Sequence, residues 1–345
     1  MRLGIIARSD NTGLGNQTME LVKMLNPDKI LLINSQFFNN NKQHPEWYKD
    51  YNVIETRKGM PRTNEVVSFL ENIDVVISCE TFYHLELVDL AKAKGIKTIL
   101  QYNYELFGNL VHPEWTLPDV FLAPSSWNLD PVMEKFGNKT KVMHLPPPTD
   151  HTLFNQAKEI NLLKDHKRIL HIAGKKAAKD RNGTDSLLVM IKYSKGDYEL
   201  VIKSQTPLNL ICKDSRVKIE VGNPDNRQDM YSGFDAMVLP RRYAGLCLPM
   251  NEALMSALPV FMTDISPNNA VLPHKWLAES KKIDTFRTKS MVDVYDVKPD
   301  KLANIIDKYV GNNRKTEIKE TAVKIGLDNF SVDNLKQKYL DIINE

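Results

Sequence analysis

The stretch of residues 236–262, AMVLPRRYAGLCLPMNEALMSALPVFM, decides the fold class of this chain. Its apolar start at 236–239 ends in a proline and predicts a short buried strand. A turn with one glycine follows, and residues 250–258 are good helix formers that stop before another proline. Residues 260–262 then resume a strand. The order strand, loop, helix, strand indicates a parallel α/β architecture.

Glu252 lies in the first turn of the predicted helix. The free N–H groups at such a helix start attract a phosphate, because they are unpaired donors at the positive end of the helix dipole. A carboxylate beside them can accept hydrogen bonds from the two neighbouring hydroxyls of a ribose. Together these features predict a site for a nucleotide sugar. The alternative interpretation is that Glu252 only caps its own helix.

This segment resembles the donor-binding segment of retaining glycosyltransferases with the GT-B fold, the group 1 or family 4-like enzymes. Their pattern is Glu-Gly-Phe-Gly-Leu, three residues, Glu-Ala, a short helix, and a Gly-x-Pro-Val strand. The matching residues are Gly245, Leu248, Glu252, Ala253, Pro259 and Val260. The resemblance implies that Glu252 binds the ribose of the donor.

Two positions depart from the family pattern. Ala244 stands where the family has its first glutamate, and Cys247 stands where it has its second glycine. The role of that glutamate near the donor sugar is therefore missing or supplied elsewhere, with Arg241 or Arg242 contributing charge. The donor-binding residues that we expect in this segment are Arg242, Gly245, Leu246, Cys247, Leu248 and Glu252.

Length and composition favour a two-domain protein of ordinary kind. The chain has 345 residues, more than one core usually serves, with 42% hydrophobic and 26% charged residues. Its net charge of +3 is too small to indicate nucleic-acid binding by itself. We expect a cytoplasmic protein, because the three cysteines are isolated and residues 1–10 do not read as a signal sequence. No apolar stretch approaches the ~20 residues of a membrane span.

Strand-like and helical runs alternate along the whole chain, which indicates parallel sheets covered by helices. The helices between them are clearest at 16–25 and 84–94. The predicted strands are 3–7, 29–33, 74–78, 98–101, 120–123 and 142–145, then 168–173, 199–203, 217–220, 236–239 and 260–262.

We expect an α/β protein of two doubly wound Rossmann-like domains facing a central cleft, the GT-B arrangement. The proline run PPPTD at 146–150 ends the first half. It divides an acceptor-side domain at 1–150 from a nucleotide-sugar-binding domain at 151–330. The final segment, 331–345, has helical spacing, and the resemblance implies that it crosses back to the first domain.

A second candidate phosphate site follows the strand predicted at 168–173, in the sequence GKKAAKDRNG at 174–183. A glycine turn with several cations between a strand and a helix can hold a diphosphate leaving group. The stretch resembles the family's Gly-Arg loop, although Asn182 replaces the usual lysine. We assign Gly174, Lys175 and Arg181 to the diphosphate, with Lys203 as a further cation. The alternative is a solvated basic turn.

The loop after the first predicted strand, RSDNTGLGNQ at 8–17, contains the pair Gly13 and Gly15. Glycines let a backbone approach a ligand closely. The stretch lacks the third glycine and the downstream acid of a dinucleotide fingerprint, so a tight turn is the alternative. The resemblance implies that both glycines face the donor phosphates.

Two further loops follow apolar strands, at the edge where doubly wound sheets carry their sites. Many relatives have a histidine there, whereas this chain has Glu80, Asn103 and Glu105. We include Glu80 and Asn103 among the catalytic candidates. Four aromatic residues in the same loops are candidates for stacking on an acceptor ring, with ordinary packing as the alternative for at least half of them: Phe82, Tyr83, Tyr102 and Tyr104.

The predicted function is transfer of a sugar from a nucleoside diphosphate sugar, which we expect to be a UDP-sugar, to an acceptor hydroxyl. The resemblance implies retention of configuration by front-face attack, in which the departing diphosphate takes the acceptor's proton. Cations that stabilise this leaving group supply the electrostatic assistance, so we expect no metal and no other cofactor. The pair Asp293 and Asp296 has the wrong spacing for a metal-binding Asp-x-Asp signature.

The acceptor stays open between three classes. The opening loop and the stretch CETFY at 79–83 are similar to transferases carried by bacterial viruses, which implies a modified DNA base, a virion protein or a glycan. A DNA acceptor needs a basic surface, for which residues 164–181, Arg57, Lys58 and Arg62 are candidates. Two other functions remain possible: a sugar-nucleotide epimerase, and a non-catalytic sugar-nucleotide-binding protein.

Overall fold

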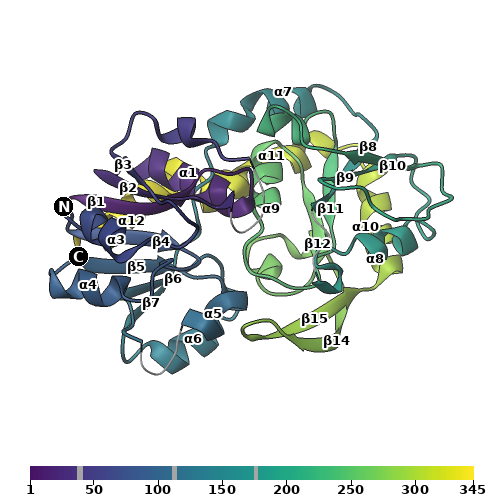
Figure 1. Ribbon diagram of the computed structural model, residues 1–345. Coiled ribbons are helices and arrows are strands. Elements are labelled where there is room, and N and C mark those ends of the chain that lie inside the picture. Colours follow the sequence, from purple (N-terminus) through teal and green to yellow (C-terminus); the bar gives the residue numbers. More distant parts are fainter. Residues whose placement is uncertain (37–41, 111–114, 175–177) are drawn as a thin grey trace. The chain divides into compact units, whose positions relative to one another are not determined.

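The computed structural model describes residues 1–36, 42–110, 115–174 and 178–345 (Figure 1). The chain forms two compact units. The first contains residues 1–149 and 332–345, and the second contains residues 150–331. Each unit is built around its own parallel sheet, and each is described by itself below.

The first unit contains a seven-stranded parallel sheet in the order β3-β2-β1-β4-β5-β6-β7. The central strands are buried over their whole length, as strands covered on both faces must be. The bounds are β1 (Leu3–Arg8), β2 (Lys29–Ile33), β3 (Val53–Glu55), β4 (Val75–Cys79), β5 (Lys97–Gln101), β6 (Val120–Ala123) and β7 (Lys141–His144).

Helices cover both faces of this sheet, because neighbouring strand residues point to opposite sides. Ile5 packs in one core with α1 (Gly13–Leu25) and α12 (Val332–Asn344). Ile6 packs in the other core. The helices contributing to that second core are α3 (Thr63–Phe69), α4 (Leu87–Ala93), α5 (Phe107–Leu110) and α6 (Leu129–Phe136). The remaining short elements of the unit are η1 (Pro45–Tyr48) and η2 (Tyr104–Leu106).

The last helix, α12, is tied to the sheet through the buried side chain of Gln101. Gln101 Nε2 donates to the hydroxyl of Tyr339 (2.9 Å) and to the carbonyl of Leu145 (2.8 Å). From α1, Gln17 Nε2 donates to Gln101 Oε1 (2.6 Å). The helical spacing of Leu335, Tyr339 and Ile342 therefore corresponds to buried positions in the first unit.

The second unit contains a six-stranded parallel sheet in the order β10-β9-β8-β11-β12-β13, together with an antiparallel pair, β14 and β15. Its main core is one continuous apolar cluster. The bounds are β8 (Arg168–Gly174), β9 (Glu199–Ser204), β10 (Val217–Val221), β11 (Ala236–Leu239), β12 (Val260–Thr263), β13 (Leu277–Ala278), β14 (Ser280–Arg287) and β15 (Met291–Val297).

Among the helices of the second unit, α10 is amphipathic, whereas α9 is buried at almost every position. Their bounds are α7 (Asn155–Leu163), α8 (Thr184–Met190), α9 (Leu248–Met255), α10 (Pro299–Val310) and α11 (Lys315–Phe330). The single-turn elements are η3 (His151–Phe154), η4 (Ala178–Asp180), η5 (Arg227–Met230), η6 (Asn268–Ala270) and η7 (His274–Trp276).

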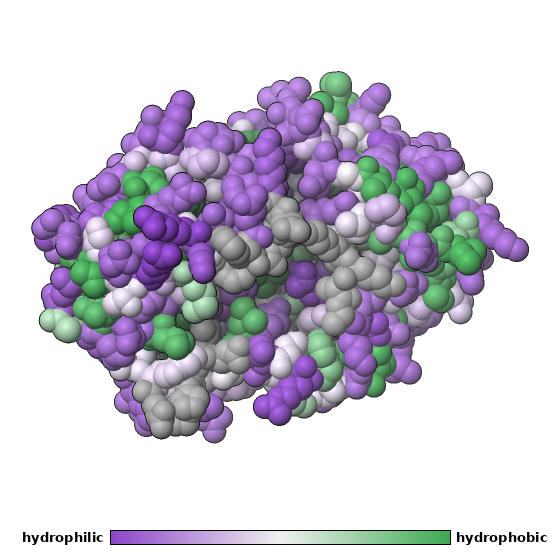
Figure 2. Space-filling view, viewed as in Figure 1, coloured by the Kyte–Doolittle hydropathy of each residue, from purple (hydrophilic) through white to green (hydrophobic). Residues whose placement is uncertain are grey.

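The α/β class with two doubly wound sheets is confirmed, and each predicted strand is present with ends shifted by at most one residue. The short strands β3 and β13 and the β14–β15 hairpin were absent from the expectation. In the described ranges, no helix has the length and apolarity required to cross a membrane. The visible face is mainly hydrophilic, with separate apolar patches (Figure 2).

Candidate functional sites at two sheet edges

In each sheet the strand order reverses at one point, between β1 and β4 in the first unit and between β8 and β11 in the second. Loops leaving two such strands diverge to opposite faces, and the space between them is where doubly wound sheets bind ligands. In the first unit, Arg8 ends β1 and Glu80 follows β4. In the second unit, Gly174 ends β8 and Pro240 follows β11. These two sheet edges are the candidate sites.

The two loops of the second unit touch each other directly at Gly183 and Pro240. A Cβ atom at residue 183 would lie 2.1 Å from the Pro240 carbonyl oxygen, and the φ of Gly183 is +72°. Both facts require glycine. Beside this contact, the Arg242 N–H donates to the Arg181 carbonyl (2.9 Å). The loop that begins at Gly174 and the loop that begins at Pro240 therefore form one structure.

The guanidinium of Arg242 holds this structure to the hairpin. Its Nη1 donates to the Lys179 carbonyl (2.8 Å), and its Nε donates to the Tyr295 carbonyl (3.2 Å) in β15. Arg241 is buried and donates from Nη1 to the Leu246 carbonyl (2.8 Å). Both arginines thus stabilise loop backbone, and the expected role of Arg242 in donor binding stays a prediction.

An aspartate of the Gly174 loop covers the start of α8, and the assignment of this loop to the diphosphate stays a prediction. Asp180 accepts hydrogen bonds from the N–H groups of Thr184 (3.1 Å) and Asp185 (2.8 Å). Its carboxylate therefore occupies two of the backbone donors at this helix start. Burial raises the pKa of Asp180. Of the residues assigned to the diphosphate, Gly174 and Arg181 remain at this edge, and Lys175 lies outside the described residues.

Lys203 lies at the end of β9 and is mostly buried. Its ammonium donates to the Asp229 carbonyl (3.2 Å), lies 3.8 Å from Glu220 and sits 5.2 Å above the ring centre of Phe234. Burial lowers the pKa of Lys203. These contacts give it a role within its own unit, and its assignment to the diphosphate stays a prediction.

Glu252 lies in the second turn of α9, so its expected place in a first turn was wrong. The helix begins at Leu248 and has no acidic residue in its first turn. The physical reason is Pro249, whose fixed φ and missing N–H suit the first turn of a helix. A helix starting there carries Glu252 past the capping positions, which removes the interpretation of Glu252 as a cap.

The Glu252 carboxylate is held from two sides. Tyr231 donates its hydroxyl to Oε2 (2.5 Å), and Arg227 forms an ion pair with Oε1. The glutamate side chain is only 7% exposed. Burial and the neighbouring Glu252 charge raise the pKa of Tyr231 well above its ordinary value. A carboxylate offers about four acceptor positions, so two donors leave capacity for the two hydroxyls of a ribose.

The loop before α9 carries the departures from the family pattern. Ala244 is buried and has a φ of +98°, in the left-handed region that favours glycine. Its neighbour Tyr243 packs edge-on against Phe286 of the hairpin, with ring centres 5.1 Å apart. Cys247 is buried in the core. Gly245, Leu246 and Leu248 belong to the same loop and helix start, and their contact with a donor stays a prediction.

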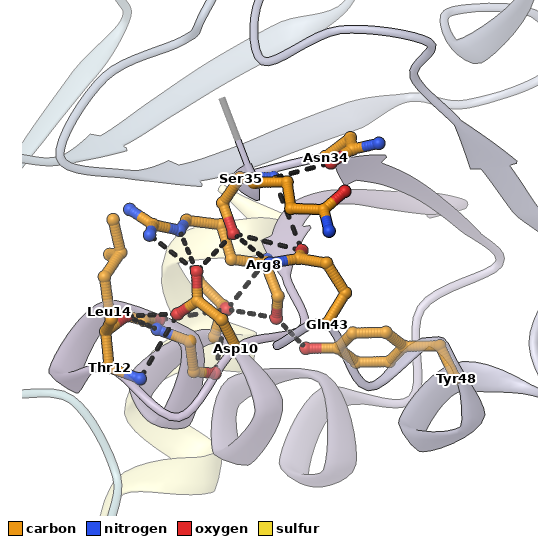
Figure 3. Close-up of polar contacts among 11 residues, drawn as sticks. Arg8, Asp10, Thr12, Leu14, Asn34, Ser35, Gln43 and Tyr48 are labelled. Atoms are coloured by element: carbon orange, nitrogen blue, oxygen red, sulfur yellow. Dashed lines mark hydrogen bonds and ion pairs between the residues drawn. The ribbon is translucent and has the colours of Figure 1, made fainter. Parts of the chain in front are cut away.

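At the edge of the first sheet, Arg8 and Asp10 form a buried ion pair (2.6 Å) surrounded by hydroxyl groups (Figure 3). Ser35 and Thr12 both donate to the Asp10 carboxylate. Burial favours its neutral form, yet these donors and Arg8 outweigh that effect and lower the pKa of Asp10. The Tyr48 hydroxyl donates to the Arg8 carbonyl (2.8 Å) and fixes the strand end.

This network explains why the loop at residues 8–17 needs a glycine, without requiring a bound ligand. A Cβ atom at Gly15 would lie 1.9 Å from the Asp10 carbonyl oxygen, so the close approach of α1 to the strand end requires glycine. The Thr12 hydroxyl accepts the Gly15 N–H (3.2 Å) and caps the helix that begins at Gly13. The tight-turn alternative therefore describes this loop, and donor binding by the two glycines stays a prediction.

Glu80 and Asn103, from the loops after β4 and β5, lie together. Asn103 Nδ2 donates to Glu80 Oε1 (3.3 Å). Burial raises the pKa of Glu80, against the opposing effects of Asn103 and the charge of Arg8. The repulsion from Glu105 adds to the upward shift. The structure thus brings two of the catalytic candidates together in the first unit, while Arg181 belongs to the second unit.

The four aromatic candidates divide between two environments. Tyr102 is buried against Phe107, with ring centres 4.8 Å apart, and Tyr104 packs against Trp127 at 5.5 Å. These two are packing residues. Phe82 and Tyr83 line a cavity, together with Arg8 and Glu80.

Sequence reasoning missed several residues that shape the two edges. Asp180 could have been found, because an aspartate four residues before a helix residue can satisfy its first N–H groups. Arg227 and Tyr231 had no local signal, since they meet Glu252 only through the tertiary fold. Within the described ranges, no group of three or more His, Cys, Asp or Glu residues is arranged to hold a metal ion.

Comparisons with known proteins identify the fold. No family model and no curated protein matches the chain. Among solved structures, HepE of Anabaena in complex with UDP-glucose is similar at a TM-score of 0.66 and 12% identity, covering 100% of this chain and 99% of that one. Sucrose-phosphate synthase of Thermosynechococcus elongatus is similar at a TM-score of 0.68 and 10% identity, covering 100% of this chain and 98% of that one. A glycosyltransferase of Rickettsia africae is similar at a TM-score of 0.66 and 12% identity, covering 99% of this chain and 97% of that one. The chain has the GT-B fold.

Proposed function

We propose that this chain is a retaining glycosyltransferase that moves a sugar from a UDP-sugar to an acceptor hydroxyl without a metal ion. The observation that carries the proposal is the edge of the second sheet. There the Gly174 and Pro240 loops are joined, and α9 follows with a carboxylate held in place by Tyr231 and Arg227. The GT-B similarity to HepE, which was solved with UDP-glucose, supports this proposal.

In this proposal Glu252 accepts hydrogen bonds from the ribose hydroxyls, and its two protein donors fix its orientation before the donor arrives. Arg181 and Lys175 stabilise the negative charge that develops on the departing diphosphate. The bond between the anomeric carbon and the diphosphate oxygen breaks, and a bond from the acceptor oxygen to the same face of that carbon forms. The acceptor's proton leaves with the diphosphate.

The test is incubation of the protein with UDP-sugars and a panel of acceptors: an oligonucleotide with a hydroxymethylated base, a peptide, a glycan and an aromatic alcohol. We expect acceptor-dependent release of UDP and a product whose anomeric proton coupling matches the donor. An epimerised UDP-sugar that accumulates without acceptor indicates an epimerase instead. Saturable binding of UDP-sugar without UDP release under any condition indicates a binding protein, the function that Ala244 in place of the first glutamate would favour.

A further inference from the structure

The cavity beside Arg8 and Glu80 in the first unit has the features of a small-molecule site. Its volume is about 460 Å³, within the roughly 300–1,000 Å³ typical of ligand pockets. It opens at the point where the strand order of the first sheet reverses, between β1 and β4. The donor site proposed for the second unit does not account for it.

The walls of this cavity are mainly apolar, and several of the apolar side chains that form them are unusually exposed. Leu85 is 65% exposed and Met60 is 55% exposed, whereas Val88 and Phe82 are buried behind them. Exposed aliphatic side chains grouped around an opening indicate a surface that an apolar ligand covers. The main wall residues are Met60, Phe82, Tyr83, Leu85, Val88 and Trp115.

Arg8 and Glu80 lie among these walls, and the polar side chains that also line the cavity include Thr81, His84 and Thr116. The Arg8 guanidinium is paired with Asp10, which follows the strand end. Among the described residues, Asn103 is the one hydrogen-bond partner of the Glu80 side chain, and it contacts Oε1. The Glu80 carboxylate therefore keeps acceptor capacity for a ligand hydroxyl.

The loop that carries Glu80 has a strained backbone. Glu80 and Tyr83 have φ values of +70° and +60°, which non-glycine residues rarely adopt. Strain of this kind persists where the surroundings hold a functional group in place. It orients Glu80 and Tyr83, the two ends of one short loop, at the same cavity.

We propose that this cavity is the acceptor site, and that the acceptor is a small molecule with an apolar, ring-bearing body and a hydroxyl group that hydrogen-bonds to Glu80. This inference rests on the proposed glycosyltransferase function. The acceptor oxygen forms the new bond to the anomeric carbon, and its proton leaves with the diphosphate, as above. Aliphatic walls disfavour a purely polar glycan, and a single arginine that is already ion-paired disfavours a DNA backbone.

The test uses 2-naphthol as a probe that has both an aromatic body and a hydroxyl group. Its binding is measured by ligand-observed NMR without any donor present. We expect saturable binding that weakens about tenfold in Leu85→Glu, since a charge replaces apolar contact at the opening. The matched control is Met133→Glu, because Met133 is an exposed apolar residue on α6 that does not line the cavity. It should bind 2-naphthol like the wild type.

A second variant, Glu80→Leu, tests the polar end of the site. We expect weaker binding of 2-naphthol and unchanged binding of naphthalene, which lacks the hydroxyl. Absence of 2-naphthol binding to the wild type, or equal affinity in Leu85→Glu and wild type, overturns the inference. A third outcome also overturns it. In this outcome the wild type binds a DNA oligonucleotide or phosphatidylglycerol vesicles but not 2-naphthol, and Leu85→Glu loses that binding.

A UDP titration of the same samples separates this inference from the proposed function. If UDP binds and 2-naphthol does not, the acceptor inference fails while the proposed function stands. If 2-naphthol binds and neither UDP nor any UDP-sugar does, the proposed glycosyltransferase function fails. With both sites present, 2-naphthol and a UDP-sugar should give a naphthyl glycoside and UDP in equal amounts.

Discussion

The hydroxyl of Tyr231 donates a hydrogen bond to Oε2 of Glu252 over 2.5 Å, in the buried interior of the second unit. Arg227 pairs with the other carboxylate oxygen. A buried carboxylate without such donors is costly, and these two donors compensate for that cost and fix the orientation of Glu252. Glu252 is therefore both a structural acceptor and the residue that we propose for the ribose.

Replacing Tyr231 with phenylalanine should lower both stability and donor affinity. One oxygen of a buried carboxylate loses its donor, which should cost about 1–3 kcal/mol of the free energy of unfolding. Urea unfolding measures this cost, and calorimetry with UDP measures the affinity. Tyr198→Phe is the matched control, because Tyr198 is also buried in this unit but donates to a neutral partner, Ser194 (2.9 Å). Equal losses in the two variants would contradict a special role for Tyr231.

Arg181→Ala should lower turnover about 10- to 1000-fold, with a smaller loss of donor affinity. The reason is that charge on the leaving diphosphate builds up in the transition state, where a preorganised cation contributes most. Steady-state kinetics with saturating UDP-sugar separates kcat from KM. The control is Lys192→Ala, which removes an exposed cation just beyond α8. Lys175→Ala should behave like Arg181→Ala. Full turnover in the double alanine variant of Lys175 and Arg181 would contradict this role and favour the interpretation of the loop as a solvated basic turn.

Gly183→Ala should disrupt the junction of the two loops in the second unit. The added Cβ meets the Pro240 carbonyl, and alanine at a φ of +72° is strained as well. Overpacking of this kind typically costs about 1–3 kcal/mol. Differential scanning calorimetry should show a lower Tm, and UDP affinity should fall with it. Gly311→Ala is the control, since Gly311 has a φ of −77° and its Cβ would make an ordinary contact. A Gly183→Ala protein with the Tm and UDP affinity of the wild type would show that the loop contact is unimportant.

His171 should make the protein less stable in mild acid. It is fully buried between the Val238 carbonyl and the Thr184 hydroxyl, and burial lowers its pKa to about 4. In the unfolded chain a histidine has a pKa of about 6.5. Between these values the unfolded state binds more protons than the folded state, so stability falls as the pH falls. The contribution of one such group approaches about 1.4 kcal/mol per pH unit.

The measurement is the free energy of unfolding at several pH values between 4 and 6.5, for the wild type and for His171→Gln. Glutamine keeps hydrogen-bonding capacity but does not ionise, so the variant should lose less stability over this range. A variant whose pH dependence equals that of the wild type would assign the acid sensitivity to other groups.

The sequence predicted most of the fold because most strands of each sheet have a recognisable local sequence pattern. Buried parallel strands such as β2 and β11 are short apolar runs between polar turns, and their bounds were predicted without error. The hairpin of β14 and β15 was not predicted, because its strands are partly exposed and mix charged with apolar residues. β13 has only two residues, too few for a pattern.

The candidate sites were less predictable because they depend on tertiary contacts. The sequence placed Gly174, Glu80 and Asn103 at sheet edges, since strand ends can be read from a pattern. It did not show that Asp180 covers the start of α8 or that Asp10 explains Gly15. Both are cases in which a loop that resembles a ligand site satisfies its own backbone groups.

Calorimetric titration of UDP into the wild type and into Glu252→Ala tests the central claim most directly. The claim is that the second unit binds the nucleotide of a sugar donor through Glu252. We predict saturable binding to the wild type and an affinity weaker by a factor of roughly 10–150 in the variant, the equivalent of losing a charged hydrogen-bond partner. Circular dichroism serves to show that the variant is folded. No saturable binding of UDP to the wild type, or equal affinities in the two folded proteins, would contradict the claim.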